Sequence, residues 1–231
     1  LLARAGVASR REIERMIADG RVTLNDEKVE TPATLLKSLR GVAVDGKAVG
    51  QPAPTQLYMF HKPEGCLTAE RDFSGRKTIY DVLPKDLPRL MPIGRLDLNT
   101  EGLLLLTNDG ELTNRITHPK YGLEKEYLVQ VDISSADVSD VAIHRMRNGI
   151  ELDDGVTAPA EVSRLQEGVL KMVIHEGKNR QIRRMCESVG YPVIRLVRTR
   201  IGPIMDKKLR PGEWRNLTQA EVKLLIEAVT E

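Results

Sequence analysis

The sequence lacks several features that would assign it to a common class of protein. It contains only two cysteines, Cys66 and Cys186, and they do not form a C-x-x-C pair. This usage argues against a disulfide framework or a zinc ribbon and favours a reducing compartment. No apolar run approaches the roughly 20 residues that cross a bilayer, and no signal peptide opens the chain. We therefore expect a cytoplasmic protein outside the membrane, or an organellar one whose transit peptide has been removed.

Motifs for nucleotides and metals are missing as well. The sequence contains no G-x-x-x-x-G-K-[ST] phosphate loop and no G-x-G-x-x-G fingerprint. His175-Glu176 begins like a zinc-protease motif, but Asn179 stands where the second histidine would be required. Cys66 has no base near it in the sequence, so a buried structural thiol is a simpler interpretation than a nucleophile. We expect neither a metal nor a cofactor.

The formal net charge is only +2, so overall charge does not indicate a nucleic-acid-binding protein. The distribution of charge is more informative, because seven basic residues and one acid lie between Lys178 and Arg200. A cluster of this density can follow a phosphate backbone, although a solvated helix face can carry one too.

At 231 residues the chain is long enough for two compact units. Residues 1–50 predict a small α/β unit, because Ser9 opens a capping box before a helical apolar pattern. Short strands are predicted at 22–24 and 42–44. Residues 51–56 lack periodicity and contain two prolines, which predicts a linker.

Residues 57–231 predict a larger domain in which strands outnumber helices. Apolar or alternating segments of strand length occur at 57–60, 103–106, 127–131 and 169–174. Helical spacing predicts one helix that begins at Asn179 or Arg180, and a last helix after Thr218 with Val222, Leu225, Ile226 and Val229 on one face. We expect an α+β fold with a mixed, mostly antiparallel sheet.

One loop stands out as a candidate site. Gly94-Arg95-Leu96-Asp97-Leu98-Asn99-Thr100-Glu101-Gly102 joins two apolar segments and is bracketed by glycines. A carboxylate in a loop at the edge of a sheet is well placed to act on a ligand. Turns also favour Asp and Asn for backbone reasons, so the spacing alone leaves both interpretations open.

This loop and three further segments resemble motifs of a known family. Gly94 to Asp97, followed by Thr100-Glu101-Gly102 and the apolar run to Gly110, is similar to the signature of the RsuA-type ribosomal RNA pseudouridine synthases. Lys125-Glu126-Tyr127 is similar to the family's second motif, and the segment from Glu176 to Met185 is similar to its third. Residues 9–25 resemble the ribosomal-protein-S4-like RNA-binding module that these enzymes carry.

The resemblance implies a fold and a set of roles. It implies a catalytic domain of the pseudouridine synthase type at 57–231, preceded by a small α/β S4-like RNA-binding domain at 1–50. Asp97 would be the essential aspartate, Tyr127 would stack on the target uracil, and Arg183 would pair with Asp97. Leu196 or Ile201 would form the floor of the pocket.

These residue types suit the reaction that the family catalyses. The bond between ribose C1′ and uracil N1 breaks, and the base is rejoined through C5, so no redox cofactor or metal is required. A carboxylate could add to the base, attack C1′ or act as a base at the sugar. A guanidinium favours the charged form of a partly buried carboxylate, and an aromatic ring offers uracil a stacking surface.

The remaining basic residues suit a large RNA substrate. The residues that we expect to contact RNA are Arg10, Arg11, Arg21, Arg95, Lys178, Arg180, Arg184, Arg198 and Arg200. We expect a monomer that recognises a stem-loop of ribosomal RNA, free or in a precursor particle.

Three other assignments remain open. Within the family, His61 to Gly65 and Gly75 to Pro84 are more similar to the large-subunit (RluB-like) branch, acting on 23S rRNA, than to the small-subunit branch, acting on 16S rRNA. A non-catalytic RNA-binding or ribosome-assembly protein is the second alternative, although such a protein has no physical reason to keep Asp97, Tyr127 and Arg183. A DNA-binding regulator is the third, and no recognition-helix pair supports it.

Overall fold

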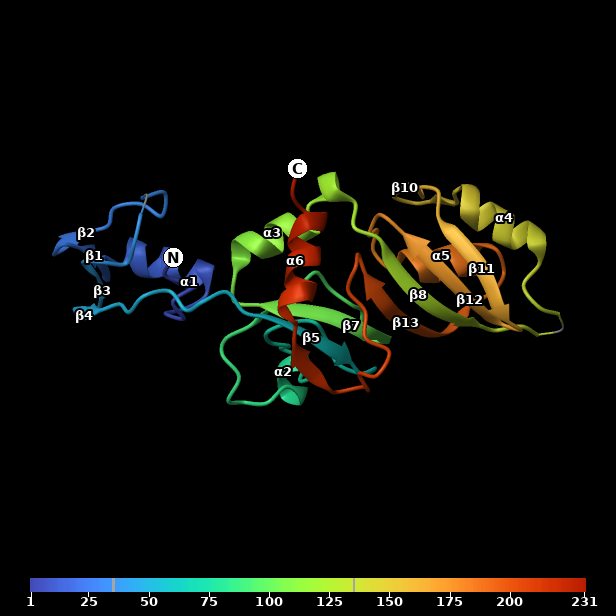
Figure 1. Cartoon of the computed structure of the whole chain (residues 1–231), viewed down its shortest axis with the longest axis horizontal. Coiled ribbons are helices and arrows are strands. Elements are labelled where there is room, and N and C mark those ends of the chain that lie inside the picture. The colour runs from blue at the N-terminus through green and yellow to red at the C-terminus, as the bar shows by residue number, and fades with distance from the viewer. Residues whose placement is uncertain (35, 135) are drawn as a thin grey trace. The chain divides into compact units, whose positions relative to one another are not determined.

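The computed structural model describes residues 1–34, 36–134 and 136–231 and divides them into two compact units (Figure 1). The first unit comprises Leu1–Gln56 with Asn108–Gly110, and the second comprises Leu57–Thr107 with Glu111–Glu231. The return of Asn108–Gly110 to the first unit was not part of the predicted division. The assignment of 1–50 as a domain of its own remains a prediction.

The first unit packs one helix against a small antiparallel sheet. Its elements are α1 (Arg10–Ala18), β1 (Val22–Leu24), β2 (Glu27–Lys28), β3 (Val42–Val44) and β4 (Lys47–Ala48), with the strands in the order β2-β1-β3-β4. The Ser9 side chain accepts a hydrogen bond from the backbone N–H of Glu12 at 3.2 Å and fixes the start of α1. Asp45 and Gly46, with φ of 49° and 77°, make the tight turn between β3 and β4.

The second unit is built on a large mixed sheet. In chain order its elements are β5 (Leu57–Lys62), α2 (Ile79–Val82), β6 (Met91–Ile93), β7 (Thr100–Thr107), α3 (Gly110–Thr117), the 3-10 turn η1 (Pro119–Tyr121), β8 (Lys125–Val131), α4 (Asp140–Asn148), β9 (Glu151–Leu152), β10 (Gly155–Val156), β11 (Glu161–Gln166), β12 (Val169–Ile174), α5 (Gln181–Ser188), β13 (Val193–Ile201), β14 (Trp214–Asn216) and α6 (Gln219–Ala228). The strand order is β11-β12-β8-β13-β7-β5-β14, with β6 paired to β7. Only β7 and β13 pair in parallel among the described strands, so the predicted mixed, mostly antiparallel α+β fold is confirmed.

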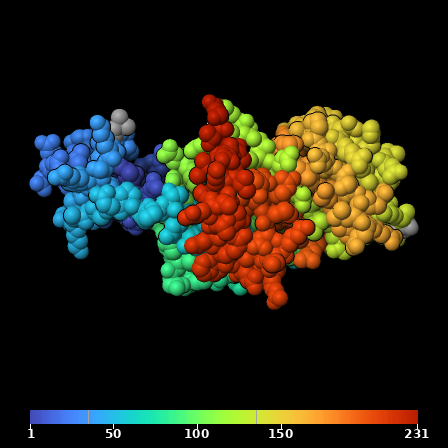
Figure 2. All heavy atoms as spheres, viewed as in Figure 1, coloured from blue at the N-terminus to red at the C-terminus, as the bar shows by residue number. Residues whose placement is uncertain are grey.

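One half of the sheet is covered on both faces. Leu103 and Leu105 of β7 point to a core shared with α3 and α6, whereas Leu104 and Leu106 point to a second core that includes Ile79 of α2. Every residue of β7 is buried as a result. Figure 1 shows α6 in front of β5 and β7, and in Figure 2 the red atoms of the C-terminal segment form the surface there.

The last helix differs from its prediction in one residue. Its capping box is present, because the Thr218 side chain accepts from the backbone N–H of Glu221 and the Glu221 side chain accepts from the backbone N–H of Thr218. Leu225 and Val229 are buried, but Ile226 is 38% exposed. The predicted apolar face was therefore one residue too wide, because Ile226 does not join the core to which Leu225 and Val229 belong.

The other half of the sheet is covered on one face by α4 and α5. Tyr127 and Val129 alternate with the exposed Leu128 along β8, as the period of a strand with one solvated face requires. Arg180 was a candidate for the first residue of α5, but it is the N-cap, and the helix begins at Gln181.

The two halves are joined where β7 and β13 run side by side. Leu196 is opposite Thr100, and Arg198 is opposite Gly102. A Cβ added at Gly102, which has φ of 109°, would lie 2.2 Å from the Arg198 carbonyl oxygen. Glycine is required here because the two backbones approach so closely.

Among the described residues, no helix is both long enough and apolar enough to cross a membrane.

Candidate active site

A cleft of about 880 Å³ opens in the second unit where its two half-sheets meet. It is lined by the loop that carries Asp97, by β8, by the start of α5 and by β13. Asp97, Tyr127 and Arg180 all face it, as do both candidate floor residues, Leu196 and Ile201. Residues that are distant in the sequence therefore meet in one cavity of a size usual for ligand sites.

The ammonium of a buried lysine is hydrogen-bonded to the backbone of the loop that carries Asp97. Lys62, at the end of β5, is fully buried, and its ammonium donates to the carbonyl oxygens of Pro63 (3.0 Å), Leu98 (3.3 Å) and Thr100 (2.8 Å). Burial lowers the pKa of Lys62, and the neighbouring negative charge of Asp97 opposes this. The carbonyls of Leu98 and Thr100 belong to the backbone on the C-terminal side of Asp97, which this cation therefore fixes.

A threonine fixes the other side of the same loop. The hydroxyl of Thr68 donates to the Leu96 carbonyl oxygen at 2.9 Å and accepts from the Leu96 N–H at 3.2 Å. The Thr100 N–H also donates to the Asp97 carbonyl oxygen at 3.0 Å. The backbone of Asp97 is thus fixed from both directions, which limits the positions its carboxylate can take.

The ion pair of Asp97 involves a different arginine from the one the resemblance implies. Arg180 Nη1 lies 3.8 Å from Asp97 Oδ2, and both side chains are partly exposed, at 48% and 36%. Arg180 adopts a left-handed backbone with φ of 50°, an unusual conformation for a non-glycine residue that tends to mark functional sites. The pair is compatible with a carboxylate that is charged and still open to a ligand.

Arg183 is placed as an anchor of the loop. Its Nη2 donates to the Asn99 carbonyl oxygen at 2.8 Å and to Thr100 Oγ1 at 3.3 Å. Burial lowers the pKa of Arg183, as does the charge of Arg180, whereas Asp97 raises it. The negative charge of Asp97 therefore acts on Arg183. The hydrogen bonds of Arg183, however, are made to the Asn99 carbonyl and the Thr100 hydroxyl.

Tyr127 lies on the sheet beneath the loop. It is buried, belongs to the core formed with α4 and α5, and stands opposite Arg198 on β13 and Met172 on β12. Because the ring lines the cleft and is packed on its other side, its position is fixed before any ligand enters.

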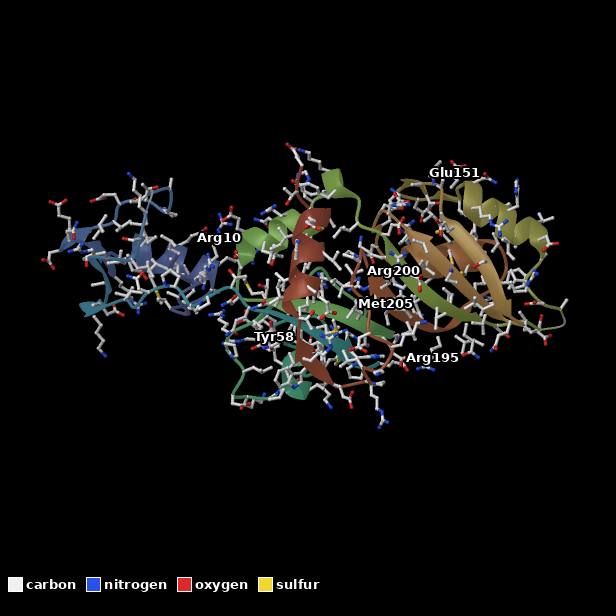
Figure 3. All side chains as sticks on the ribbon, viewed as in Figure 1. Arg10, Tyr58, Glu151, Arg195, Arg200 and Met205 are labelled. Carbon is white, nitrogen blue, oxygen red and sulfur yellow. The ribbon has the colours of Figure 1, made fainter. Side chains whose placement is uncertain are left out.

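The predicted RNA-contacting residues fall into two groups. Several are already paired with carboxylates: Arg21 with Asp45, Arg184 with Asp154, and Arg200 with Glu124 and Glu126. Of these residues, Figure 3 labels Arg200. Their charge is partly neutralised within the chain, which weakens the case that they bind phosphates.

The other predicted residues differ in exposure. Arg10 and Arg11 are exposed on α1, and Arg10 Nε lies 3.9 Å from Glu14. Arg95 is exposed, Lys178 is half-buried, and both line the cleft. Arg198 lines the cleft as well, but it is only 5% exposed.

Sequence reasoning missed Lys62, Thr68 and Lys125 as residues of this site. Lys125 lines the cleft on the same strand as Tyr127. The sequence held one signal for Lys62, because a lysine that ends an otherwise apolar strand needs a buried partner. No local pattern could have identified Thr68, since its partner Leu96 is distant in the sequence.

The described residues contain no group of three or more His, Cys, Asp and Glu side chains that could hold a metal. Cys66 and Cys186 are both buried, and burial raises the pKa of both thiols, that of Cys186 to about 12.

Comparison with known proteins places this geometry in context. The family model for RNA pseudouridylate synthase matches residues 56–188, and the S4 domain model matches residues 1–39. An uncharacterized RNA pseudouridine synthase of Aquifex aeolicus is 44% identical over 99% of this chain and 92% of that protein. Ribosomal large subunit pseudouridine synthase B of Bacillus subtilis is 38% identical over 97% and 93%. A crystal structure of a pseudouridylate synthase has a TM-score of 0.71 at 31% identity and covers 97% of this chain and 96% of that one.

Proposed function

We propose that this chain, which belongs to the RNA pseudouridylate synthase family, isomerises a specific uridine of large-subunit (23S) ribosomal RNA to pseudouridine. The observation that carries the proposal is the position of Asp97 in the cleft, with Tyr127 on the floor and Arg180 at 3.8 Å. The naming of relatives such as those of Bacillus subtilis and Vibrio vulnificus as ribosomal large subunit pseudouridine synthase B supports the choice of RNA.

The reaction conserves atoms and oxidation state. The C1′–N1 bond breaks, a C1′–C5 bond forms, the proton on C5 is lost and N1 gains a proton. Asp97 can take part by adding to the base, by attacking C1′ or by removing a proton from the sugar. Each route needs a negatively charged and accessible carboxylate, and the nearby cation of Arg180 stabilises that charge.

The buried ring of Tyr127 has two uses in such a reaction. It offers a flat surface on which an unstacked uracil can rest. It also sits on a rigid strand, so the base can turn above it without moving the walls of the cleft. Leu196 and Ile201 beside it present apolar surface that keeps water from the detached base.

The target nucleotide must leave the RNA helix to reach this cleft, because Tyr127 is buried and Asp97 is only partly exposed. We therefore propose a stem-loop substrate with an accessible uridine, bound by a monomer in a reducing compartment such as the cytoplasm. The S4 domain match at residues 1–39 and the exposed Arg10 and Arg11 support an additional RNA contact by the first unit.

The proposal is tested by tritium release from RNA labelled at uracil C5. Separate 23S and 16S transcripts are incubated with the wild-type chain, with Asp97→Asn and with Asp86→Asn, a control that removes an exposed carboxylate outside the cleft. We expect release from 23S RNA by the wild type and by Asp86→Asn, and none by Asp97→Asn. Release from 16S RNA alone would reassign the substrate.

Tight RNA binding without release from any precursor or mature RNA would favour a ribosome-assembly protein that retains the fold. Release by Asp97→Asn at the wild-type rate would remove Asp97 from the chemistry.

A further inference from the structure

Arg198 lies on the floor of the cleft with part of its guanidinium unpaired. Its Nε donates to the Leu103 carbonyl oxygen at 2.8 Å, and the side chain is 5% exposed. Its Nη2 is buried and has no hydrogen-bond partner among the described residues. A buried charged donor without a partner is costly, so a ligand atom that accepts from it would bind with advantage.

A second cation shares this floor. Lys125 lines the same cleft, two positions before Tyr127 on β8. Burial lowers the pKa of Lys125, and the positive charge of Arg198 lowers it further. In the part of the chain that the structure describes, the Lys125 ammonium makes no hydrogen bond or ion pair. Two like charges therefore face one cavity and disfavour each other.

The carboxylates of the cleft are engaged elsewhere. Asp97 pairs with Arg180. Glu176 accepts from the backbone N–H of Ala158 at 2.7 Å and from Gln181 Nε2 at 2.9 Å. Five basic residues line the cleft against the two carboxylates of Asp97 and Glu176, so the lining keeps an excess of positive charge.

We propose that Arg198 and Lys125 form an anion subsite that binds one phosphodiester group of the RNA next to the nucleotide that enters the cleft. The proposal rests on the proposed function, because it assumes that RNA occupies this cavity. A guanidinium fork matches the geometry of a phosphate. Arg198 stands directly opposite Tyr127 in the sheet, so a base stacked on the ring brings its own backbone close to this pair.

A neutral uracil carbonyl is the competing ligand, and the charges argue against it. A carbonyl oxygen can accept from Arg198, but it leaves two partly buried positive charges without compensation. A phosphodiester supplies both an acceptor and a negative charge.

The test is a thermodynamic cycle that combines substitutions in the protein with the replacement of one charged phosphate of the RNA at a time by a neutral group. A ribosomal RNA stem-loop selected for binding to the wild-type chain is made with one methylphosphonate at a time along its loop. Dissociation constants are measured for the wild type and for Arg198→Gln, Lys125→Gln and Arg195→Gln. Arg195 is the matched control, because it lies on the same strand and pairs with Glu101 outside the cleft lining (Figure 3).

We expect one methylphosphonate position to weaken wild-type binding about tenfold to a hundredfold. Arg198→Gln and Lys125→Gln should each bind unmodified RNA more weakly and lose their sensitivity to that same position, whereas Arg195→Gln should keep it. The slope of log K against log salt should fall by about one for each variant of the pair. If Arg198→Gln and Lys125→Gln lose sensitivity to the same methylphosphonate position, misfolding of one variant cannot be the cause of that loss.

The subsite is overturned if both variants remain as sensitive as the wild type at every position. It is also overturned if Arg198→Gln and the wild type differ in dissociation constant for every methylphosphonate RNA, but bind equally well to an RNA whose uracil lacks one carbonyl oxygen. Binding is measured without turnover, so a positive cycle without tritium release would refute the proposed function and leave the subsite standing.

Discussion

The ammonium of Lys62 lies 2.8 Å from the carbonyl oxygen of Thr100, three positions after Asp97. With the bonds to Leu98 and Pro63, this contact makes a buried cation the support of the loop that carries the carboxylate. Lys62 is a positioning residue in this arrangement, since its ammonium is bonded to the backbone beneath the loop.

Replacement of this cation should reduce both stability and activity. Lys62→Met leaves one buried and two partly buried carbonyls without a charged donor, so we expect the free energy of unfolding to fall by about 3 kcal/mol. Urea unfolding measures the loss, and tritium release at low temperature measures the rate of the folded fraction. Lys85→Met is the control, because among the described residues the exposed Lys85 donates only to the Tyr80 carbonyl. Equal stability of the two variants would contradict the role of Lys62.

Arg183 and its neighbour Arg184 should differ in their effect on kcat. Arg183→Gln removes the bonds to Asn99 and Thr100, so the carboxylate loses alignment and kcat should fall about tenfold to a hundredfold. Arg184→Gln removes a surface pair with Asp154, and kcat should stay within about twofold. Steady-state tritium release gives both values. If Arg180→Gln lowers kcat and Arg183→Gln does not, the ion pair of Asp97 governs alignment in place of the loop anchor.

Gly102→Ala should separate the two halves of the sheet. The added Cβ would meet the Arg198 carbonyl oxygen at 2.2 Å, and the backbone cannot yield without disturbing the pairing of β7 with β13. We expect a loss of more than about 3 kcal/mol in unfolding free energy. Gly75→Ala is the control, because Gly75 has φ of 76° and no atom within 4 Å of an added Cβ. It should cost only about 1 kcal/mol, from the backbone conformation alone. Equal losses would show that the close approach is tolerated.

The acid limit of stability should depend on Glu221. Its pKa is lowered first by the hydrogen bond from Arg215 and further by the bond from the Thr218 N–H. A carboxylate whose pKa is lower in the folded state stabilises the fold above its unfolded pKa, about 4.3 for glutamate, and loses this effect as the pH falls below it. Unfolding free energies at a series of pH values should therefore decline less steeply below about pH 4.3 in Glu221→Gln than in the wild type.

At neutral pH the same variant should be less stable by about 1 kcal/mol, the usual effect of a lost helix cap. Glu227→Gln, on the exposed side of the same helix and paired only at 3.9 Å with Lys223, should follow the wild-type curve. A Glu221→Gln curve parallel to the wild type would contradict the assignment.

The sequence carried the local part of this structure and little of its long-range geometry. The start of α1 at Ser9 and the start of the last helix after Thr218 depend on residues a few positions apart, and both were predicted. The family motifs selected Asp97 and Tyr127, and both line the cleft.

What escaped prediction depends on contacts between distant segments. Three features require knowledge of which segments are neighbours in space. They are the hydrogen bond from Lys62 to Thr100, the ion pair of Arg180 with Asp97, and the burial of Arg198. Arg198 illustrates the reason. It was predicted to contact RNA as part of a basic cluster, but its burial follows from the pairing of β13 between β7 and β8, which the sequence does not show.

The parallel pairing of β7 with β13 also determines when the sheet can finish folding during synthesis of the chain. The bond from Arg198 to Leu103 spans 95 positions, and contacts of that separation form late in folding. Until the ribosome has released residues beyond Val193, β7 lacks its neighbour at Thr100–Gly102, whereas β6 already pairs with the same edge at Leu105–Thr107. An open strand edge invites pairing with other chains. A growing chain of this protein therefore passes through a stage that is vulnerable to aggregation, and the same late step that closes the edge completes the cleft.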